Sequence, residues 1–286
     1  MKALVIGCIC LFTVTVGVSQ RQHFKFGEGY RSFIAYVPTN LDTTKAAPLV
    51  FNFHGGGMTA VEQMYYTEMN EAAEAHGFIV VYVQGVDGNW NVGFDMDYDT
   101  GTDDVSYVKE VLKLVKEAHN IDDKAIYATG LSRGGFFTYR LAIEMPETFA
   151  AIASVGAPIP NQVQKRHEAK GKVAVMLVQG DADFVVEFGG KGEAYLSAQQ
   201  TIDHWVKHNA SKTTAVVTEI DKADDGTKVI IKTHEGEVPV KLVQVVNGGH
   251  TWPGANDFNI GYPLGKTTHD INMNELMWEF FEANRK

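Results

Sequence analysis

The sequence predicts an α/β protein in which helices cover both faces of a mostly parallel β-sheet. Short apolar runs, typical of strands buried on both sides, alternate with longer amphipathic segments of helical periodicity. The 286 residues are 45% hydrophobic and 21% charged, which is enough apolar material for a sizeable core. No low-complexity linker or repeat interrupts residues 20–286, so we expect them to form a single domain.

The N-terminal segment, residues 1–19, has the layout of a secretory signal peptide. Lys2 gives a positive start, an apolar stretch follows, and small residues precede a predicted cleavage site near Ser19. The apolar stretch is short for a membrane-spanning helix, so we expect no membrane span. A buried N-terminal strand or a membrane anchor is the alternative. Both cysteines, Cys8 and Cys10, lie in this segment, so the predicted mature chain is a secreted or periplasmic protein without disulfides.

The first half of the remaining chain predicts a β-hairpin, two further strands and two helices in a regular order. Residues 23–38 alternate around a glycine turn and indicate a β-hairpin. The runs 47–54 and 78–85 predict buried strands, and a helix that ends at Gly77 lies between them. Residues 103–120 then carry Val and Leu at helical spacing, with two aspartates at the predicted helix N-terminus.

The second half continues the alternation of strand and helix. Apolar runs predict further buried strands at residues 125–130, 149–158 and 172–183. Amphipathic segments predict helices at residues 133–146, 192–209 and 268–284. Residues 213–246 differ, because a period of two and an Asp-Gly turn indicate a small antiparallel hairpin there.

Charge and composition exclude several classes of function. The formal net charge is −10 and no basic run is present, which argues against a nucleic-acid-binding protein. No zinc pattern or glycine-rich phosphate loop occurs, so we expect neither a metal nor a cofactor. Residues 95–104 bring aspartates to alternate positions, as calcium loops do, but they lack the glycine and the closing glutamate of an EF-hand. A solvated acidic loop is the first interpretation of this segment.

A serine flanked by glycines lies where a predicted strand meets a predicted helix. Residues 130–134 read Gly-Leu-Ser-Arg-Gly and match the pattern G-x-S-x-G. In a nucleophile elbow the serine occupies a strained turn whose neighbours must be glycine, since side chains there would clash. A purely structural turn also needs small residues. The pentapeptide alone therefore leaves open whether Ser132 is a nucleophile.

Two later segments supply candidates for the base and the acid that a nucleophilic serine requires. In α/β-hydrolases the chain order is serine, acid, histidine. Asp183 follows a predicted strand and is the candidate acid, while Asp181 in the same loop is the alternative if it does not simply cap the turn. His250 lies in a rigid Gly- and Pro-containing loop before the final helix and is the candidate base.

An upstream glycine run predicts where the oxyanion would be stabilised. Residues 53–57 read Phe-His-Gly-Gly-Gly and match the HGGG-type motif of esterases, although a flexible turn is the alternative. We expect the amide of Gly56, with Gly57 as the neighbouring candidate, to act together with the amide of Arg133. The Arg133 side chain is expected to pair with a nearby aspartate, and attraction of an acidic substrate group is the alternative.

Four further residues lie next to these motifs. Trp90 and Trp252 are candidate substrate-binding residues that form an aromatic wall, with ordinary packing as an equal alternative. Asp103 and Asp104 are interpreted as helix-capping charges, and the alternative for them is a role in orienting the site.

Taken together, the motifs resemble the secreted α/β-hydrolase esterases that group polyhydroxybutyrate depolymerase-like proteins with feruloyl and acetylxylan esterases (carbohydrate esterase family one). The resemblance covers most of the predicted mature chain in family order, on the segments FHGGG (53–57), DGNWN (87–91), TDDVSYV (102–108), GLSRGG (130–135), QGDADFVV (179–186) and GGHTWPG (248–254). It implies an α/β-hydrolase fold with Ser132 as nucleophile, Asp183 as acid and His250 as base.

The resemblance also implies a substrate class, with some departures. It implies hydrolysis of feruloyl or acetyl esters of plant cell-wall polysaccharide through an acyl-enzyme, with poly(3-hydroxybutyrate) or another polyester as the alternative substrate. A serine peptidase and a non-catalytic binding protein on the same fold are the rival classes. Many members of the family have His-Gly-Thr where this chain has residues 179–181, Pro at the position of Glu187, and a small or amide residue at that of Arg133. These departures leave the triad intact and bear on specificity.

Overall fold

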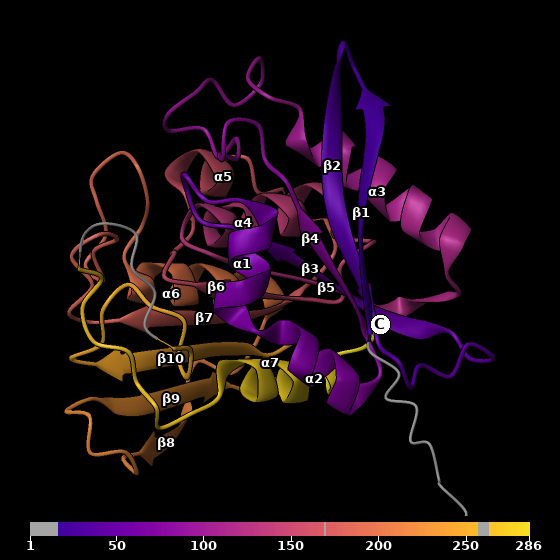
Figure 1. Ribbon diagram of the computed structural model, residues 1–286. Helices are drawn as coiled ribbons and strands as arrows, with labels where there is room; N and C mark the ends of the chain where they lie inside the picture. The colour runs from indigo at the N-terminus through magenta and orange to yellow at the C-terminus, as the bar shows by residue number, and fades with distance from the viewer. Residues whose placement is uncertain (1–16, 169, 257–262) are drawn as a thin grey trace, which may run out of the picture.

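The computed structural model describes residues 17–168, 170–256 and 263–286, and it contains one ten-stranded sheet (Figure 1). The strand order in the sheet is β1-β2-β4-β3-β5-β6-β7-β10-β9-β8. The strands are β1 (Val18–Phe26), β2 (Gly29–Val37), β3 (Ala47–Phe53), β4 (Ile79–Val83), β5 (Ile121–Leu131), β6 (Ala151–Val155), β7 (Ala174–Gly180), β8 (Val216–Ile220), β9 (Lys228–His234) and β10 (Val240–Val246). The helices are α1 (Ala60–Thr67), α2 (Met69–His76), α3 (Asp104–Ala118), α4 (Arg133–Glu144), α5 (Asn161–Lys165), α6 (Ala198–Asn209) and α7 (Met273–Glu282).

The centre of the sheet is parallel and its edges are antiparallel. Six neighbouring strands pair in parallel, namely β4, β3, β5, β6, β7 and β10. Their carboxyl ends therefore all point the same way, toward one end of the strands. The hairpin β1–β2 joins antiparallel to β4, and β9 and β8 extend the opposite edge antiparallel to β10. Loops that follow parallel strands are where α/β folds carry their chemistry.

Helices cover both faces of the sheet and create two apolar cores. In Figure 1, α1, α2 and α7 lie in front of the sheet, and their buried side chains pack together in one core. Buried residues of α3, α4 and α6 belong to the second core, on the opposite face. The expectation of a mostly parallel sheet with helices on both faces is therefore confirmed.

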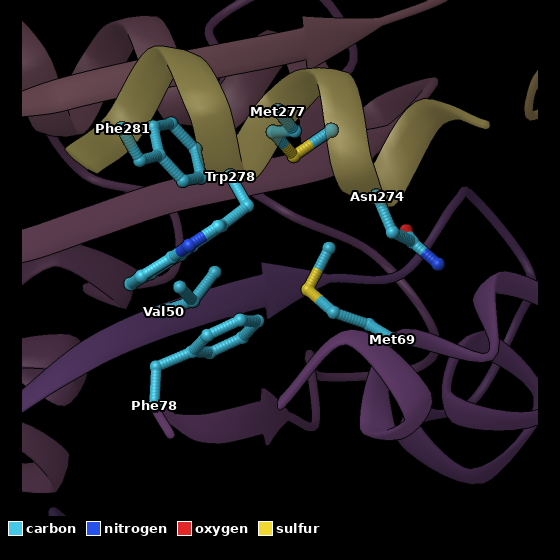
Figure 2. Close-up of a pocket in the computed structure, with 7 residues that line it drawn as sticks. All are labelled: Val50, Met69, Phe78, Asn274, Met277, Trp278 and Phe281. Atoms are coloured by element: carbon cyan, nitrogen blue, oxygen red, sulfur yellow. The ribbon is translucent and has the colours of Figure 1, made fainter. Parts of the chain in front are cut away.

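The closing helix α7 is packed tightly onto the first of these cores (Figure 2). Its Met277, Trp278 and Phe281 face Val50 of β3 and Phe78. The Trp278 and Phe78 rings stack with 4.4 Å between their centroids. The space between these side chains is too small for a water molecule, so this contact is core packing and not a ligand site.

Several boundaries differ from the sequence-based expectations. The segment 213–246 forms three strands: the expected antiparallel hairpin β8–β9 is present, and β10 pairs antiparallel with β9 on one side and in parallel with β7 on the other. The helix expected over 192–209 begins only at Ala198, where Ser197 and Gln200 form a capping box. The short helices α1 and α5 were not anticipated from the sequence.

The predicted signal segment lies mostly outside the described residues, which begin at Gly17. Its last two residues, Val18 and Ser19, belong to β1 and pair with β2. Among the helices that the structure describes, none has the length and apolar character needed to cross a bilayer.

Candidate active site

Ser132 occupies a strained turn between β5 and α4. Its backbone has φ 53° and ψ −117°, which is a conformation that residues other than glycine rarely adopt. The Ser132 amide donates to the Val155 carbonyl at 2.8 Å, and its carbonyl accepts from the Phe136 amide at 2.9 Å. These two bonds hold the serine at the carboxyl edge of the sheet in the conformation of a nucleophile elbow.

The flanking glycines are required by the close approach of β3. A Cβ atom on Gly134 would lie 2.2 Å from the carbonyl oxygen of Phe53, and one on Gly130 would lie 2.6 Å from the carbonyl carbon of Gly134. Neither position has room for a side chain, since backbone atoms are on the other side of the contact. The pattern G-x-S-x-G here records a steric requirement of the turn.

His250 and Asp183 are in direct contact. The Nδ1 atom of His250 lies 2.7 Å from Oδ2 of Asp183, and both side chains are buried. The other carboxylate oxygen of Asp183 accepts from the amides of Val185 and Val186, each at 2.8 Å. A carboxylate held in this way fixes the orientation and tautomer of the imidazole.

Asp181, the alternative acid, faces elsewhere. Its carboxylate accepts from the Gln244 side chain at 2.9 Å and from the Asn247 amide at 2.7 Å, on the exposed side of the loop. Asp181 thus holds the turn together, while Asp183 is the carboxylate that contacts His250.

The elbow and the histidine meet at the end of β6. The carbonyl of Val155 accepts from Ser132, and the next residue, Gly156, has φ 64°. A Cβ atom on Gly156 would lie 3.0 Å from both Cε1 and Nδ1 of His250. Ser132 thus contacts Val155, and the His250 ring contacts the next residue, Gly156. These contacts with consecutive residues bring Ser132 and His250 close together.

The structure distinguishes Gly56 from Gly57 as an oxyanion donor. The Gly57 amide donates to the Gly88 carbonyl at 2.8 Å and is not free to bind substrate. The amides of Gly56 and Arg133, by contrast, have no hydrogen-bond acceptor among the residues that the structure describes. A Cβ atom on Gly56 would lie 3.6 Å from Cβ of Arg133, so the two free amides are neighbours. They form a pair of donors beside Ser132 of the kind that stabilises an oxyanion.

The buried His54 side chain holds this glycine run in place through hydrogen bonds of its ring. Its Nε2 accepts from the Gly85 amide at 2.9 Å, and its Nδ1 lies 2.8 Å from the Gly55 carbonyl, so the ring is neutral and carries its proton on Nδ1. Burial lowers the pKa of His54 to about 4. In the sequence His54 is recognisable only as part of the motif, and nothing there indicates this supporting role.

Trp90 and Trp252 are structural residues, which corrects the expectation that they form a wall against the substrate. Both indoles are buried, with 0% and 1% of their surface exposed, and neither lines the pocket around Ser132. The Trp90 indole donates to the His54 carbonyl at 3.0 Å and stacks on Phe137. These contacts make Trp90 part of the support of the oxyanion loop.

Trp252 connects the histidine loop to the helices on the front face. Its amide donates to the Tyr66 hydroxyl of α1 at 2.9 Å. Its indole donates to the Asn274 side chain of α7 at 3.2 Å. The packing alternative is therefore the one that the contacts favour for both tryptophans.

A pocket of about 400 Å³ opens beside Ser132. Its lining comes from the elbow with the start of α4 and from three loops, and consists of Gly56, Phe94, Asp95, Ser132, Arg133, Phe136, Val185, Val186, Lys191, Ala194 and Tyr195. The rings of Phe94, Phe136 and Tyr195 contact one another, with centroids 5.3 Å apart for Phe94–Phe136 and 5.2 Å for Phe136–Tyr195. These three rings form the aromatic wall that was expected from Trp90 and Trp252.

The Arg133 side chain forms the expected ion pair. Its guanidinium contacts the carboxylate of Asp95 and lies over the Phe94 ring, 4.4 Å from the centroid. Burial lowers the pKa of Arg133 to about 10, so the group still carries its charge at neutral pH. Arg133 thus contributes a free amide to one side of the elbow and a paired cation to the pocket.

Carboxylates of the acidic loop 95–104 bind donors of the protein itself, both within the loop and outside it. Asp97 accepts from the amides of Asp99 and Thr100, and Asp99 pairs with Arg166 at 2.9 Å. Within the described part of the chain, no three His, Cys, Asp or Glu side chains are grouped so as to hold a metal ion.

Asp103 and Asp104 have different roles at the start of α3. Asp103 caps the helix by accepting from the Ser106 amide at 3.0 Å, as expected. Asp104 is buried, pairs with Arg31 at 3.0 Å and accepts from the Asn91 amide at 2.8 Å. Asp104 therefore anchors the loop that carries Trp90 and Phe94, which is the orienting alternative.

Known structures share this architecture. An acetyl xylan esterase from Aspergillus awamori superposes with a TM-score of 0.65 over 92% of this chain and 99% of that one, at 16% sequence identity. A thermostable esterase matches with a TM-score of 0.53 over 66% of this chain and 52% of the other, at 20% identity. These likenesses establish the α/β-hydrolase fold.

Curated relatives share sequence over much of the chain. The putative esterase NocK of Nocardia uniformis subsp. tsuyamanensis is 28% identical over 228 residues, which are 72% of this chain and 66% of that protein. Feruloyl esterase B of Piromyces equi is 25% identical over 235 residues, 77% of this chain and 42% of that protein. The bifunctional acetylxylan esterase/xylanase XynS20E of Neocallimastix patriciarum is 30% identical over 160 residues, 55% of this chain and 22% of that protein. The chain thus spans less than two thirds of the length of each of these relatives.

A family model supplies the assignment. The model described as esterase PHB depolymerase matches residues 31–188, which include the glycine run, the elbow and the acid. Because this match covers more than half of the sequence, the chain belongs to the esterase PHB depolymerase family.

Proposed function

We propose that the protein is a secreted serine esterase that hydrolyses carboxylic esters through an acyl-enzyme. The observation that carries this proposal is the buried His250–Asp183 pair beside a serine held in a strained turn. Family membership supports ester hydrolysis, and the signal-like layout of residues 1–19 supports secretion.

In the proposed mechanism His250 removes the proton of Ser132 as the hydroxyl attacks the ester carbonyl. Asp183 keeps the imidazole oriented and stabilises the imidazolium that forms. The negative charge on the carbonyl oxygen is held by the amides of Gly56 and Arg133, each worth about 3 kcal/mol to the transition state. The leaving alcohol takes its proton from His250, and water then repeats the sequence on the acyl-enzyme.

The pocket favours an aromatic acyl group over an acetyl group. Three mutually contacting rings line it, together with Val185 and Val186, and its volume of about 400 Å³ greatly exceeds the needs of a two-carbon acyl chain. Aromatic walls bind aromatic groups through offset-stacked and edge-to-face contacts. We therefore favour feruloyl-type esters of plant cell-wall polysaccharide as substrate, in line with the relative named feruloyl esterase B.

A polyester is the second candidate substrate. The family description favours it, as does a relative named poly(3-hydroxyalkanoate) depolymerase C of Paucimonas lemoignei, 30% identical over 147 residues. Val185 and Val186 give the same pocket an aliphatic side that suits a hydroxyalkanoate chain.

Two measurements test the proposal. The purified protein is expected to hydrolyse 4-nitrophenyl acetate, and Ser132→Ala is expected to lower kcat by at least about 10⁴-fold, since the nucleophile is lost. Turnover that persists unchanged in the correctly folded variant would contradict the mechanism. A side-by-side assay on methyl ferulate, acetylated xylan and poly(3-hydroxybutyrate) then ranks the substrates, and a low rank for methyl ferulate would remove the aromatic preference.

A further inference from the structure

The lining of the pocket carries a cation and an anion that neutralise each other. Arg133 follows Ser132 directly in sequence, and Asp95 comes from the loop between β4 and α3. Both side chains line the pocket and are paired with each other. Another basic side chain of the lining, Lys191, is exposed and makes no ion pair among the described residues.

The Arg133 guanidinium is largely shielded from water, so its electrostatic interactions are strong. Only 15% of the Arg133 side chain is exposed, and its planar group rests on the Phe94 ring. Hydrogen bonds between a guanidinium and a carboxylate are strong and geometrically specific, especially where water is scarce. An unpaired Arg133 would therefore be a binding site for a carboxylate within the pocket that holds the nucleophile.

We propose that Asp95 is a specificity-determining residue: it occupies the carboxylate-binding position of Arg133 and so restricts the pocket to acyl groups without a negative charge. This inference rests on the proposed function, because it concerns the acyl group that Ser132 would receive. It goes further by assigning a charge to the substrate that the enzyme selects.

The physical reason is competition for one cation. A substrate whose acyl chain ends in a carboxylate would meet Asp95 already bound to Arg133, so it would gain no partner and would be repelled by a like charge. A neutral acyl group meets a wall without net charge and packs on the aromatic rings. The exposed Lys191 is screened by water and contributes much less to this choice.

Asp95→Asn separates these effects, because asparagine keeps the shape of the side chain and loses its charge. Two series of 4-nitrophenyl esters would be compared, the half-esters of succinic, glutaric and adipic acid and neutral alkanoates of matching length. The measured quantity is the ratio of kcat/KM for the charged ester to that for the neutral ester. We expect Asp95→Asn to raise this ratio by about tenfold or more at the chain length that reaches Arg133.

Asp99→Asn is the matched control. Asp99 lies in the same loop and pairs with Arg166, but it does not line the pocket. We expect it to change the ratio by less than about twofold, since exposed ion pairs act weakly on neighbouring sites. Removing one negative charge from the loop is thereby distinguished from freeing Arg133.

A double variant, Asp95→Asn with Arg133→Met, identifies the group that binds the carboxylate. The gain is expected to vanish in this variant, because the freed guanidinium is gone. A ratio that stays at the wild-type value in Asp95→Asn at all three chain lengths overturns the proposal, as does a gain that survives in the double variant. Hydrolysis of the neutral esters by the wild type, and its loss in Ser132→Ala, report separately on the proposed function.

Discussion

The two sides of the pocket are built in different ways. On one side, the elbow and the oxyanion amides are positioned by backbone contacts so close that Gly130 and Gly134 have no space for a side chain. On the other side, Phe94, Asp95 and Tyr195 project from two separate loops and contact one another through their side chains or through Arg133. From this contrast we expect that the proposed chemistry of the site depends on the backbone, while the proposed choice of substrate depends on a few replaceable side chains.

The largest expected effect comes from the backbone side. Gly134→Ala would place Cβ 2.2 Å from the Phe53 carbonyl oxygen, so β3 and the elbow must move apart. We expect kcat/KM to fall by at least about 100-fold, as it does when an oxyanion donor is displaced. Overpacking is expected to lower the free energy of unfolding by up to about 3 kcal/mol.

Gly189→Ala is the control for this change. A Cβ atom at Gly189 meets nothing within 4 Å, and its loop adjoins the pocket wall. Esterase assays and urea denaturation of both variants check the comparison. Equal activities in the two variants would show that the elbow tolerates displacement and would remove the distinction between the two sides.

A second effect is a dependence of stability on pH, caused by His54 beneath the oxyanion loop. Its pKa is about 4 in the folded protein and near the ordinary 6.5 in the unfolded chain, so the unfolded state binds more protons between these values. The free energy of unfolding is therefore expected to fall as the pH drops from 6.5 to 4, by about 3 kcal/mol from this group.

Urea denaturation at pH 7, 5 and 4 measures this dependence in the wild type and in His54→Gln. The variant cannot titrate at this position, so its stability is expected to change less with pH by that amount, whatever its stability at pH 7. Identical pH dependence in the two proteins would mean that His54 is not kept neutral by burial.

The smallest effect is expected on the side of the pocket that Phe94, Asp95 and Tyr195 form. Phe94→Ala removes one of three contacting rings, and such contacts are each worth about 0.5–1.5 kcal/mol. We expect kcat/KM for methyl ferulate to fall by up to about tenfold and kcat/KM for 4-nitrophenyl acetate to change little.

Phe184→Ala is the matched control for Phe94→Ala, because Phe184 is 58% exposed and does not line the pocket. Kinetics on both esters compare the two variants. Equal losses on the aromatic ester and the acetyl ester in Phe94→Ala would mean that the ring stabilises the elbow instead of selecting the substrate.

The sequence predicts the backbone side of the site well, because its signals are local. Strand, glycine and serine follow one another over a few residues at 130–134, and the same holds for the glycine run at 53–57. The choice between Asp181 and Asp183 is different, since both lie in one loop. It depends on the direction of each carboxylate, toward Gln244 or toward His250, which is a tertiary property.

The side of the pocket that is formed by side chains from separate loops was not predictable, because it too depends on tertiary structure. Trp90 and Trp252 adjoin motif loops in sequence, but their indoles turn inward to donate to His54 and Asn274. Phe94 and Tyr195 stand 101 positions apart and carry no motif of their own, so nothing in the sequence indicates that they share a wall. The ion pair of Arg133 was expected, but the sequence did not identify Asp95 as its partner.

The split of the helices between two faces has a consequence for how the protein loses activity. The serine begins α4 on one face, whereas the histidine loop is tied through Trp252 to α1 and α7 on the other. Elements of a protein open locally with different free energies. If α7 detaches on heating, the proposed general base, His250, is released while the elbow stays folded. Thermal inactivation would then precede global melting, because local unfolding of α7 would disrupt the site before the rest of the fold.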